Sequence, residues 1–323
     1  LIPIVLHVGD RYVFRVKDIK EWRNYILGLP AIVLATTPVY IIQAFIGTDV
    51  KTPKWGSTYH LVWIFVTVAI TLALFYLFRF RSYEDRYVLC LFLVLVLFFH
   101  YNSIYLMGLT LKRLPFQLCN IAAYMFLVAF LFKWKKMFHF CFLANIVGTV
   151  FAIVAPDFGV GHFGFWNTHF LFQHSYVLIV PALCLGLRLF PRLTKKSILY
   201  YFVGFTAYIS FCYVLGTILN GYQDVTGETV NYFYMFDFKT AFDYFPFLQF
   251  VEDYYFEFGR FIVYPLVFVF VYLGFSALSM LFFLAVRWLY KYEDDMLELR
   301  RSAIDLLEKI TKKKSKIPKH YID

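Results

Sequence analysis

Charged residues are scarce in this chain of 323 residues: Asp, Glu, Lys and Arg together make up 16% of it, whereas hydrophobic residues make up 61%. The mean hydropathy of +0.65 lies far above the values of soluble domains. This composition excludes a soluble protein and predicts a multispanning membrane protein. The aromatic content of 23% fits that class, because Phe faces lipid and Tyr gathers at membrane interfaces.

Cysteine is also scarce, and the five thiols form no C-x-x-C motif and no Cys/His pair with zinc-ligand spacing. This spacing excludes a disulfide framework and a structural zinc site. The chain also has no nucleotide-binding motif and no internal repeat, so we expect neither a metal nor a cofactor. Four cysteines lie within apolar runs, where packing explains them: Cys90, Cys141, Cys184 and Cys212.

Long apolar runs are abundant, and eight of them approach the roughly 20 residues that cross a hydrocarbon core. We therefore predict an all-α polytopic helix bundle at residues 25–287, between an N-terminal segment at 1–24 and a charged tail at 288–323. The predicted spans are Tyr25–Ile46, Leu61–Phe78, Tyr87–Leu109, Pro115–Phe132, Phe138–Ala155, Thr168–Leu189, Ile198–Leu219 and Phe261–Arg287.

Basic residues divide unevenly between the two sets of loops and ends. Of the 31 Lys and Arg residues, 25 fall on the side that holds both termini. The positive-inside rule then predicts that both termini are cytoplasmic, in a multi-pass protein of the cell membrane. The net charge of +10 is therefore a topology signal. We expect no nucleic-acid partner, because the basic residues are spread through short loops and do not gather on one face.

Two further segments are predicted to lie at the membrane surfaces. In the tail, apolar residues recur at helical spacing among acidic and basic ones, which predicts a cytoplasmic amphipathic helix that docks on anionic lipid or on another subunit. The aromatic and acidic segment at 220–260 cannot cross the membrane, so we predict short amphipathic pieces at the outer interface. That segment either caps the bundle or forms a lid.

The stretch L-P-F-Q-L-C-N at residues 114–120 places a thiol at the outer end of the fourth span. Pro115 suits the first position of a helix, which puts Cys119 about one turn inside. Lys112 and Arg113 precede it, and cations together with a helix N-terminus favour the nucleophilic thiolate. The same two cations could hold a lipid phosphate. Packing is the alternative explanation of Cys119.

His174 is the best-placed base on the same side. Asn167 and Thr168 are a plausible N-cap for the sixth span, which puts His174 about two turns in, at a depth comparable with that of Cys119. An ionisable residue inside a span usually faces the bundle interior or a cavity. The alternative is a structural, hydrogen-bonded imidazole.

Several short motifs occur in a fixed order: L-P-F-Q-L-C-N-I-A-A at 114–123, A-P-D at 155–157, L-F-Q-H at 171–174, N-G-Y from residue 220, and V-N-Y-F-Y-M at 230–235. In these motifs the chain resembles the bacterial YwaF-type integral membrane proteins, which are related to the eukaryotic ether-phospholipid acyltransferases of the transmembrane protein 164 family. The resemblance implies Cys/His acyl transfer on phospholipids, with Cys119 as nucleophile and His174 as base. Gln117 and Asn120 depart from the bacterial pattern, which has His and Asp at these places, so a carboxylate that orients His174 would come from elsewhere, with Asp157 the nearest candidate.

These residues together predict a lipid-accessible cavity at the outer leaflet of a bacterial plasma membrane. The leading hypothesis is an acyltransferase that takes a chain from a phospholipid, holds it as a Cys119 thioester and passes it to a lysolipid or lipoprotein. Oxyanion donors would be the amide of Gln117 or Asn120, or backbone N–H groups. A noncatalytic subunit of a membrane complex is the second hypothesis, and a transporter the third. The polar residues expected to line the cavity are His100, Asn102, Gln117, Cys119, Asn120, Asn145, Asp157, Gln173, His174, Asn220 and Asn231.

Overall fold

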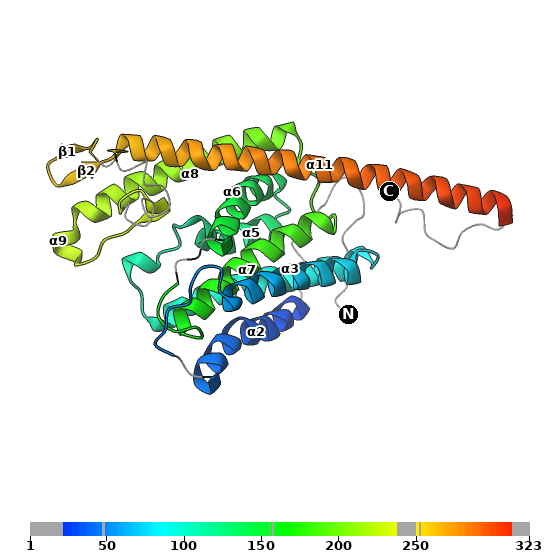
Figure 1. The fold of residues 1–323 in the computed structure, drawn as a ribbon, viewed down its shortest axis with the longest axis horizontal. Coiled ribbons are helices and arrows are strands. Elements are labelled where there is room, and N and C mark those ends of the chain that lie inside the picture. Colours follow the sequence, from blue (N-terminus) through cyan, green and yellow to red (C-terminus); the bar gives the residue numbers. More distant parts are fainter. Residues whose placement is uncertain are drawn as a thin grey trace.

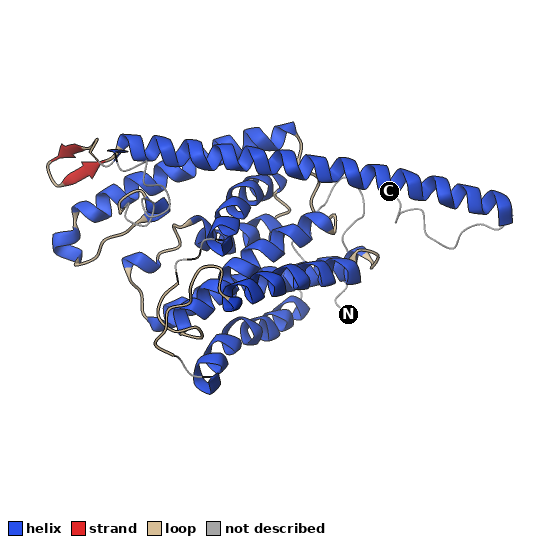
Figure 2. Ribbon diagram, in the orientation of Figure 1, coloured by secondary structure: helices blue, strands red, loops and turns tan. Residues whose placement is uncertain are grey.

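The computed structural model describes residues 22–46, 49–154, 156, 158–237, 250–251 and 253–311. Within these ranges the chain is a bundle of long helices with one small hairpin at one end (Figures 1 and 2). The long helices are α2 (Trp22–Ile46), α3 (Thr58–Phe78), α4 (Tyr83–Asn102), α5 (Leu118–Leu131), α6 (Lys135–Val154), α7 (Phe165–Gly186), α8 (Lys195–Gly221) and α11 (Pro265–Thr311). The short elements are η1 (Ser103–Met107), η2 (Leu111–Arg113), α9 (Gln223–Thr226), η3 (Tyr232–Tyr234), β1 (Phe256–Phe258) and β2 (Phe261–Val263).

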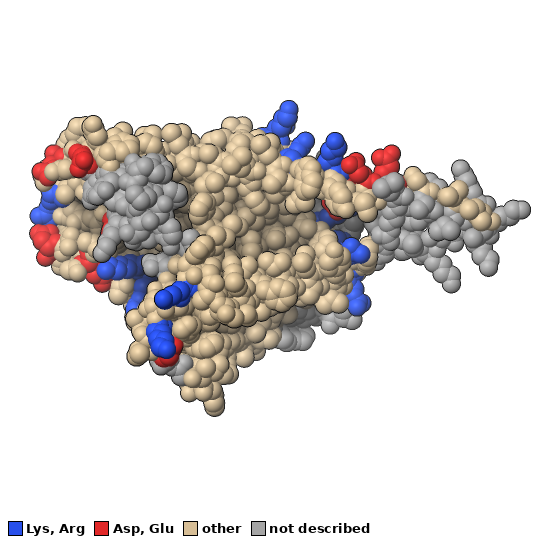
Figure 3. Space-filling model, viewed as in Figure 1, with Lys and Arg blue, Asp and Glu red and all other residues tan. Residues whose placement is uncertain are grey.

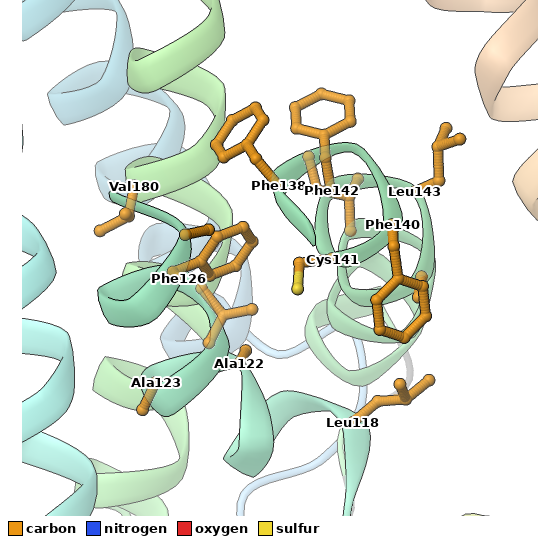
Figure 4. Close-up of a cluster of buried hydrophobic side chains, with 14 of the residues drawn as sticks. Leu118, Ala122, Ala123, Phe126, Phe138, Phe140, Cys141, Phe142, Leu143 and Val180 are labelled. Carbon is orange, nitrogen blue, oxygen red and sulfur yellow. The ribbon is translucent and has the colours of Figure 1, made fainter. Parts of the chain in front are cut away.

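The middle of the bundle is built from α4, α5, α6 and α7, and the other helices pack around them: α2 on α4, α3 on α7, and α8 and α11 on α6. Figure 4 shows buried side chains of α5 and α6 side by side, with Phe126 of α5 on the side of Phe138 and Cys141 of α6. Phe126 of α5 meets Phe138 of α6 with ring centroids 6.0 Å apart. Without a hydrophobic force between helices in lipid, such close packing holds a membrane bundle together.

Seven helices of the described chain are long and apolar enough to cross a membrane, and α5 is a shorter apolar helix. These eight helices correspond one to one to the eight predicted spans, so the predicted class of an all-α polytopic bundle is confirmed. Charged side chains gather at the two ends of the face drawn in Figure 3, with an uncharged band between them. This is the charge pattern of a membrane-spanning bundle. We call the end with the hairpin the outer end, following the predicted orientation.

The start of α5 differs from the prediction. The helix begins at Leu118, and Gln117 before it is extended (φ −74°, ψ 147°), so Pro115 is not its first residue. The reason is tertiary: the Phe116 carbonyl accepts a hydrogen bond from Tyr208 Oη at 3.0 Å. Cys119 therefore lies in the first turn of α5, where backbone N–H groups lack a partner within the helix.

The outer segment contains a strand pair that the sequence did not predict. β1 and β2 form an antiparallel hairpin, with Phe258 opposite Phe261. The last span was predicted to start at Phe261, and this was wrong, because α11 starts at Pro265. Alternating aromatic residues fit a pleated ribbon as well as an interfacial helix, so composition alone does not separate the two. Residues 238–249, a third of the predicted outer segment, lie outside the described residues.

The last helix has no break at the predicted boundary between bundle and tail. α11 runs for 47 residues, and its second half extends beyond the other helices (Figure 1). It is fixed where it leaves the bundle, because Arg192 in the turn after α7 pairs with Glu293 at 2.5 Å and with Asp294 at 2.6 Å. The Leu193 N–H also donates to Tyr290 Oη at 3.2 Å.

Candidate functional site

A cavity of about 380 Å³ opens near the outer ends of α4, α5 and α7. Its wall is mixed, with amides, imidazoles and aromatic rings, which is typical of a binding site for a small molecule or a lipid headgroup. The lining residues are Tyr101, Ile104, Asn120, Phe158, Gly159, Trp166, Asn167, His169, Phe170, Gln173 and His174.

One face of α7 forms much of this wall. Trp166, Asn167, Phe170, Gln173 and His174 recur at spacings of one, three and four residues, which places them on the same side of a helix. Only the last two were expected at the cavity. The helical spacing of the Asn, Gln and His could have revealed the whole face from the sequence.

The start of α7 corrects the predicted cap. The helix begins at Phe165 after Gly164, where a Cβ would lie 2.7 Å from the Val160 carbonyl oxygen, so glycine is needed there. Asn167 is inside the helix and holds the preceding loop instead: its amide nitrogen donates to the carbonyls of Gly159 at 2.9 Å and Gly161 at 2.6 Å. The loop that closes this side of the cavity is thus tied to the helix that lines it.

The hydrogen bond of His174 determines its tautomer. Its Nδ1 lies 2.7 Å from the Phe170 carbonyl oxygen, and a carbonyl oxygen only accepts, so Nδ1 carries the hydrogen. The Phe170 ring packs against the imidazole with centroids 4.1 Å apart. In the neutral ring the other nitrogen, Nε2, then holds the free lone pair that a general base needs. A backbone carbonyl therefore orients the imidazole through Nδ1. Asp157, the predicted candidate for this role, lies outside the described residues, so its role stays a prediction.

Cys119 lies next to the cavity residue Asn120, and its own side chain is partly exposed. The thiol donates to Asn120 Oδ1 at 3.4 Å. Gln173 of α7 donates from Nε2 to the Cys119 carbonyl at 3.0 Å, which ties the first turn of α5 to the helix that carries His174. Asn120, Gln173 and His174 thus share the cavity wall, and the Cys119 backbone contacts this wall through Gln173. Cys119 itself is not among the lining residues.

Two further histidines are stacked at this wall: His169 lines the cavity, and His100 lies behind it. His100 stacks on His169 with ring centroids 4.5 Å apart, and its Nδ1 and Nε2 face the carbonyls of Ala35 and His169. His100 therefore links α2 to α7. Two buried polar atoms of lining residues have no hydrogen-bond partner among the described residues, His169 Nδ1 and Gln173 Oε1. Such orphaned atoms at a cavity are normally satisfied by a ligand or by water.

The two cations before Cys119 are placed differently. Arg113 donates to the carbonyls of Met107 and Gly108, and its guanidinium lies 5.1 Å from the ring centroid of Trp166, a wall residue. Arg113 thereby fixes the turn at the rim of the cavity. Lys112 is exposed.

Gln117, Asn220 and Asn231 do not line the cavity. They attach the segment that follows α9 to the bundle: Gln117 Nε2 donates to the Asn231 carbonyl at 2.7 Å, and Gln117 Oε1 accepts from Phe233 N–H at 3.0 Å. Asn220 bonds both backbone groups of Val230. Both ends of the Gln117 amide group therefore hold this segment, and one Nε2 hydrogen keeps no partner among the described residues. Of the two predicted oxyanion donors, only Asn120 lines the cavity, so its amide is the better placed.

The remaining polar residues expected at the cavity have local roles. Asn102 bonds Tyr124 Oη and the Phe98 carbonyl, and Asn145 donates to the Cys141 carbonyl. Among the residues that the structure describes, no group of three or more His, Cys, Asp or Glu side chains could hold a metal ion.

The sequence matches the TMEM164 family over residues 55–273, which include the cavity, α5 and α7. The chain belongs to the TMEM164 family. This membership confirms the relation that the ordered motifs indicated, and it supports a multi-pass membrane protein. No curated protein and no solved structure matches the chain.

Proposed function

We propose that this TMEM164 family protein is a membrane-embedded acyltransferase, which moves a fatty acyl chain from a phospholipid to a lysolipid or lipoprotein acceptor through a thioester on Cys119. The observation that carries the proposal is the orientation of His174. The Phe170 carbonyl fixes its tautomer, so that Nε2 is the free base in a cavity whose wall continues, through Asn120, to the thiol.

The first half of the proposed reaction forms the thioester. The thiol turns from Asn120 towards His174 and gives its proton to Nε2, and the thiolate attacks the ester carbonyl carbon of the phospholipid. The negative charge on the carbonyl oxygen is stabilised by the Asn120 amide and by backbone N–H groups of the first turn of α5. When the carbon–oxygen bond breaks, the lysophospholipid oxygen takes the proton from His174.

The second half reverses these roles. A hydroxyl or amine of the acceptor gives its proton to His174 Nε2 and attacks the thioester carbonyl carbon. The carbon–sulfur bond breaks, the thiolate leaves and regains the proton from the imidazolium, and the acyl chain is now on the acceptor. Each step needs only a proton transfer and an ester or thioester bond, so neither a metal nor a redox cofactor takes part in the proposed cycle.

The decisive experiment is to look for the intermediate. Purified protein incubated with phospholipid should carry a hydroxylamine-sensitive acyl mass on the peptide with Cys119. Cys119→Ser should abolish this adduct with little loss of stability, and His174→Ala should slow acylation by about 10²- to 10⁴-fold. If the folded wild-type protein never forms the adduct, or if Cys119→Ser supports full function in cells, the protein is not this enzyme. A noncatalytic subunit of a membrane complex then becomes the better explanation, and copurification at fixed stoichiometry would identify it.

The same assay tests the proposed phosphate contact. The proposed contact is between the lipid phosphate and the cations Lys112 and Arg113. Arg113 also fixes the turn at the rim, so we choose Lys112→Gln, which removes one of the two charges without disturbing that turn. This variant should raise the phospholipid concentration needed for half-maximal acylation while leaving the maximal rate unchanged. An unchanged requirement would remove the phosphate contact from the proposal but leave the thioester in place.

A further inference from the structure

His169 is a buried imidazole at the cavity that the proposed reaction does not use. It lines the cavity, and only 6% of the residue is exposed. Its Nδ1 is buried and has no hydrogen-bond partner among the described residues. Nε2 is therefore the ring nitrogen through which His169 can bind a ligand in the cavity.

The missing partner of Nδ1 indicates which nitrogen of His169 carries the hydrogen. Buried N–H groups without an acceptor are rarer in proteins than unsatisfied acceptors, so the neutral ring keeps its hydrogen on Nε2. His174, five residues later, has the opposite tautomer, because its Nδ1 donates to the Phe170 carbonyl. The wall of the cavity thus carries one imidazole that accepts a hydrogen and one that donates it.

Neighbouring rings hold His169 in place. Its ring lies nearly parallel to that of His100, with centroids 4.5 Å apart, and to that of Phe165, with centroids 5.8 Å apart. These stacks restrict the rotation of the imidazole, so Nε2 keeps a fixed direction. A doubly protonated ring would leave a charged N–H without an acceptor at Nδ1, so His169 is a neutral donor.

The position of His169 along α7 indicates which ligand atom this donor meets. Trp166, about one turn nearer the outer end, has the Arg113 guanidinium over its ring. Gln173, about one turn further in, donates to the Cys119 carbonyl. His169 therefore lies between the cation at the rim and the turn of α5 that carries the thiol.

A glycerophospholipid whose ester lies beside Cys119 has its phosphate further out, on the headgroup side of the membrane. None of the described lining residues is acidic, so none of them repels an anionic oxygen there. We infer that His169 Nε2–H donates a hydrogen bond to a phosphate oxygen of the bound phospholipid. It is the inner partner of the phosphate that Lys112 and Arg113 are proposed to contact from the rim. This inference rests on the proposed phospholipid substrate, but not on the thioester.

Binding of a lipid that cannot react tests the contact separately from catalysis. A dialkyl glycerophospholipid has ether bonds in place of both esters, so it cannot acylate Cys119. The matching dialkylglycerol has the same chains but no phosphate. Native mass spectrometry of the purified wild-type protein should give a lower apparent Kd for the dialkyl phospholipid than for the dialkylglycerol.

Two variants separate the donor from the stacked ring. His169→Gln keeps an N–H near the position of Nε2 but loses the stacks, and its Kd for the dialkyl phospholipid should stay within about threefold of the wild-type value. His169→Phe keeps a flat ring for the stacks but has no donor. It should raise this Kd about 10- to 100-fold and leave the Kd for the dialkylglycerol unchanged. Thermal unfolding shows whether each variant is folded.

A purely structural role of the ring predicts the reverse order of the two variants, and that result would overturn the inference. The inference is also wrong if the wild type binds both lipids equally, if the two variants bind the dialkyl phospholipid alike, or if His169→Phe weakens binding of both lipids alike. If the contact is confirmed but no acyl adduct forms on Cys119, the proposed acyl transfer fails and the phosphate contact remains.

Discussion

At the scale of single residues, Lys133 stands out because its ammonium group is held among aromatic rings. Its Nζ lies 4.0 Å from the ring centroid of Tyr87 and 4.3 Å from that of Phe130, and it has no hydrogen-bond partner among the described residues. Burial lowers the pKa of Lys133 to about 7. The rings act in the opposite direction, because their faces attract the charged form.

This burial predicts a pH dependence of stability. The pKa of Lys133 is about 10.5 when exposed and about 7 when folded, so between these values the unfolded chain binds one proton more. Folding stability therefore rises with pH through this window and is lowest below pH 7. Lys133→Met fills the same space without a charge. We expect this variant to be about 1 to 3 kcal/mol more stable at pH 7 and to show a flatter stability curve up to pH 9.5.

Thermal unfolding in detergent measures both effects. Lys136→Met is the matched control, because this lysine lies in the first turn of α6 and is exposed. It should leave both the stability and the slope unchanged. A loss of stability in Lys133→Met at pH 7 would show that attraction to the rings outweighs the cost of burial.

The residue scale also separates what the sequence could predict at the site from what it could not. Cys119 and His174 were singled out from their depth in the membrane and from the motifs. The structure places His174 on the wall of the cavity and Cys119 next to the wall residue Asn120. The partner of His174 is local, because Phe170 lies one helical turn earlier in α7. The sequence does not determine the side-chain rotamer that directs Nδ1 to this carbonyl, so the bond was not predicted. Gln117 looked like a site residue because it is polar and precedes Cys119, whereas its partners are more than a hundred residues away.

At the scale of elements, the segment from Val230 to Asp237 is held on the bundle by a few specific contacts. Phe233 adopts a left-handed backbone (φ 56°) and buries its ring beside Phe205 and Tyr208. Non-glycine residues in this region are strained, so their surroundings must hold them there. Gln117 supplies two of the bonds that do so.

We therefore expect Gln117→Ala to loosen this segment without unfolding the bundle. The change leaves the Phe233 N–H and the Asn231 carbonyl without these partners, which costs about 1 to 3 kcal/mol locally. Hydrogen exchange should increase around residues 230–237 and remain unchanged in α6. Asn145→Ala is the control, because Asn145 bonds only within α6 among the contacts described. Unchanged exchange at 230–237 would mean that the buried rings alone hold the segment.

The elements show where sequence patterns stop being informative. Apolar runs of span length predicted eight helices because lipid demands that length of every helix that crosses it. The ends were less predictable, because they depend on tertiary partners such as the Tyr208 hydroxyl that holds Phe116 outside α5. The hairpin at Phe256–Val263 was missed for a related reason: its aromatic residues suit several interfacial structures, and the pairing of its strands fixes which one forms.

At the scale of the whole molecule, the distribution of charge predicts the orientation in the membrane. The hairpin end should face outward and the α11 tail should face the cytoplasm. Glu257→Cys and Glu298→Cys place exposed thiols at these two ends. A membrane-impermeant maleimide applied to intact cells should label Glu257→Cys, and it should label Glu298→Cys only after the cells are opened. Labelling of Glu298→Cys in intact cells would reverse the predicted topology.

The continuity of α11 has a mechanical consequence. Its 47 residues form one rod of roughly 70 Å at 1.5 Å per residue, which is far longer than the hydrocarbon core of about 30 Å. A rigid rod transmits torsion, so a rotation of its C-terminal end about the axis turns its membrane part by the same angle. Arg192 couples that rotation to the turn after α7, the helix that carries His174. A partner bound to the end of α11 would therefore fix how the whole bundle is rotated about the membrane normal. It would also fix the direction in which the cavity faces the surrounding lipids.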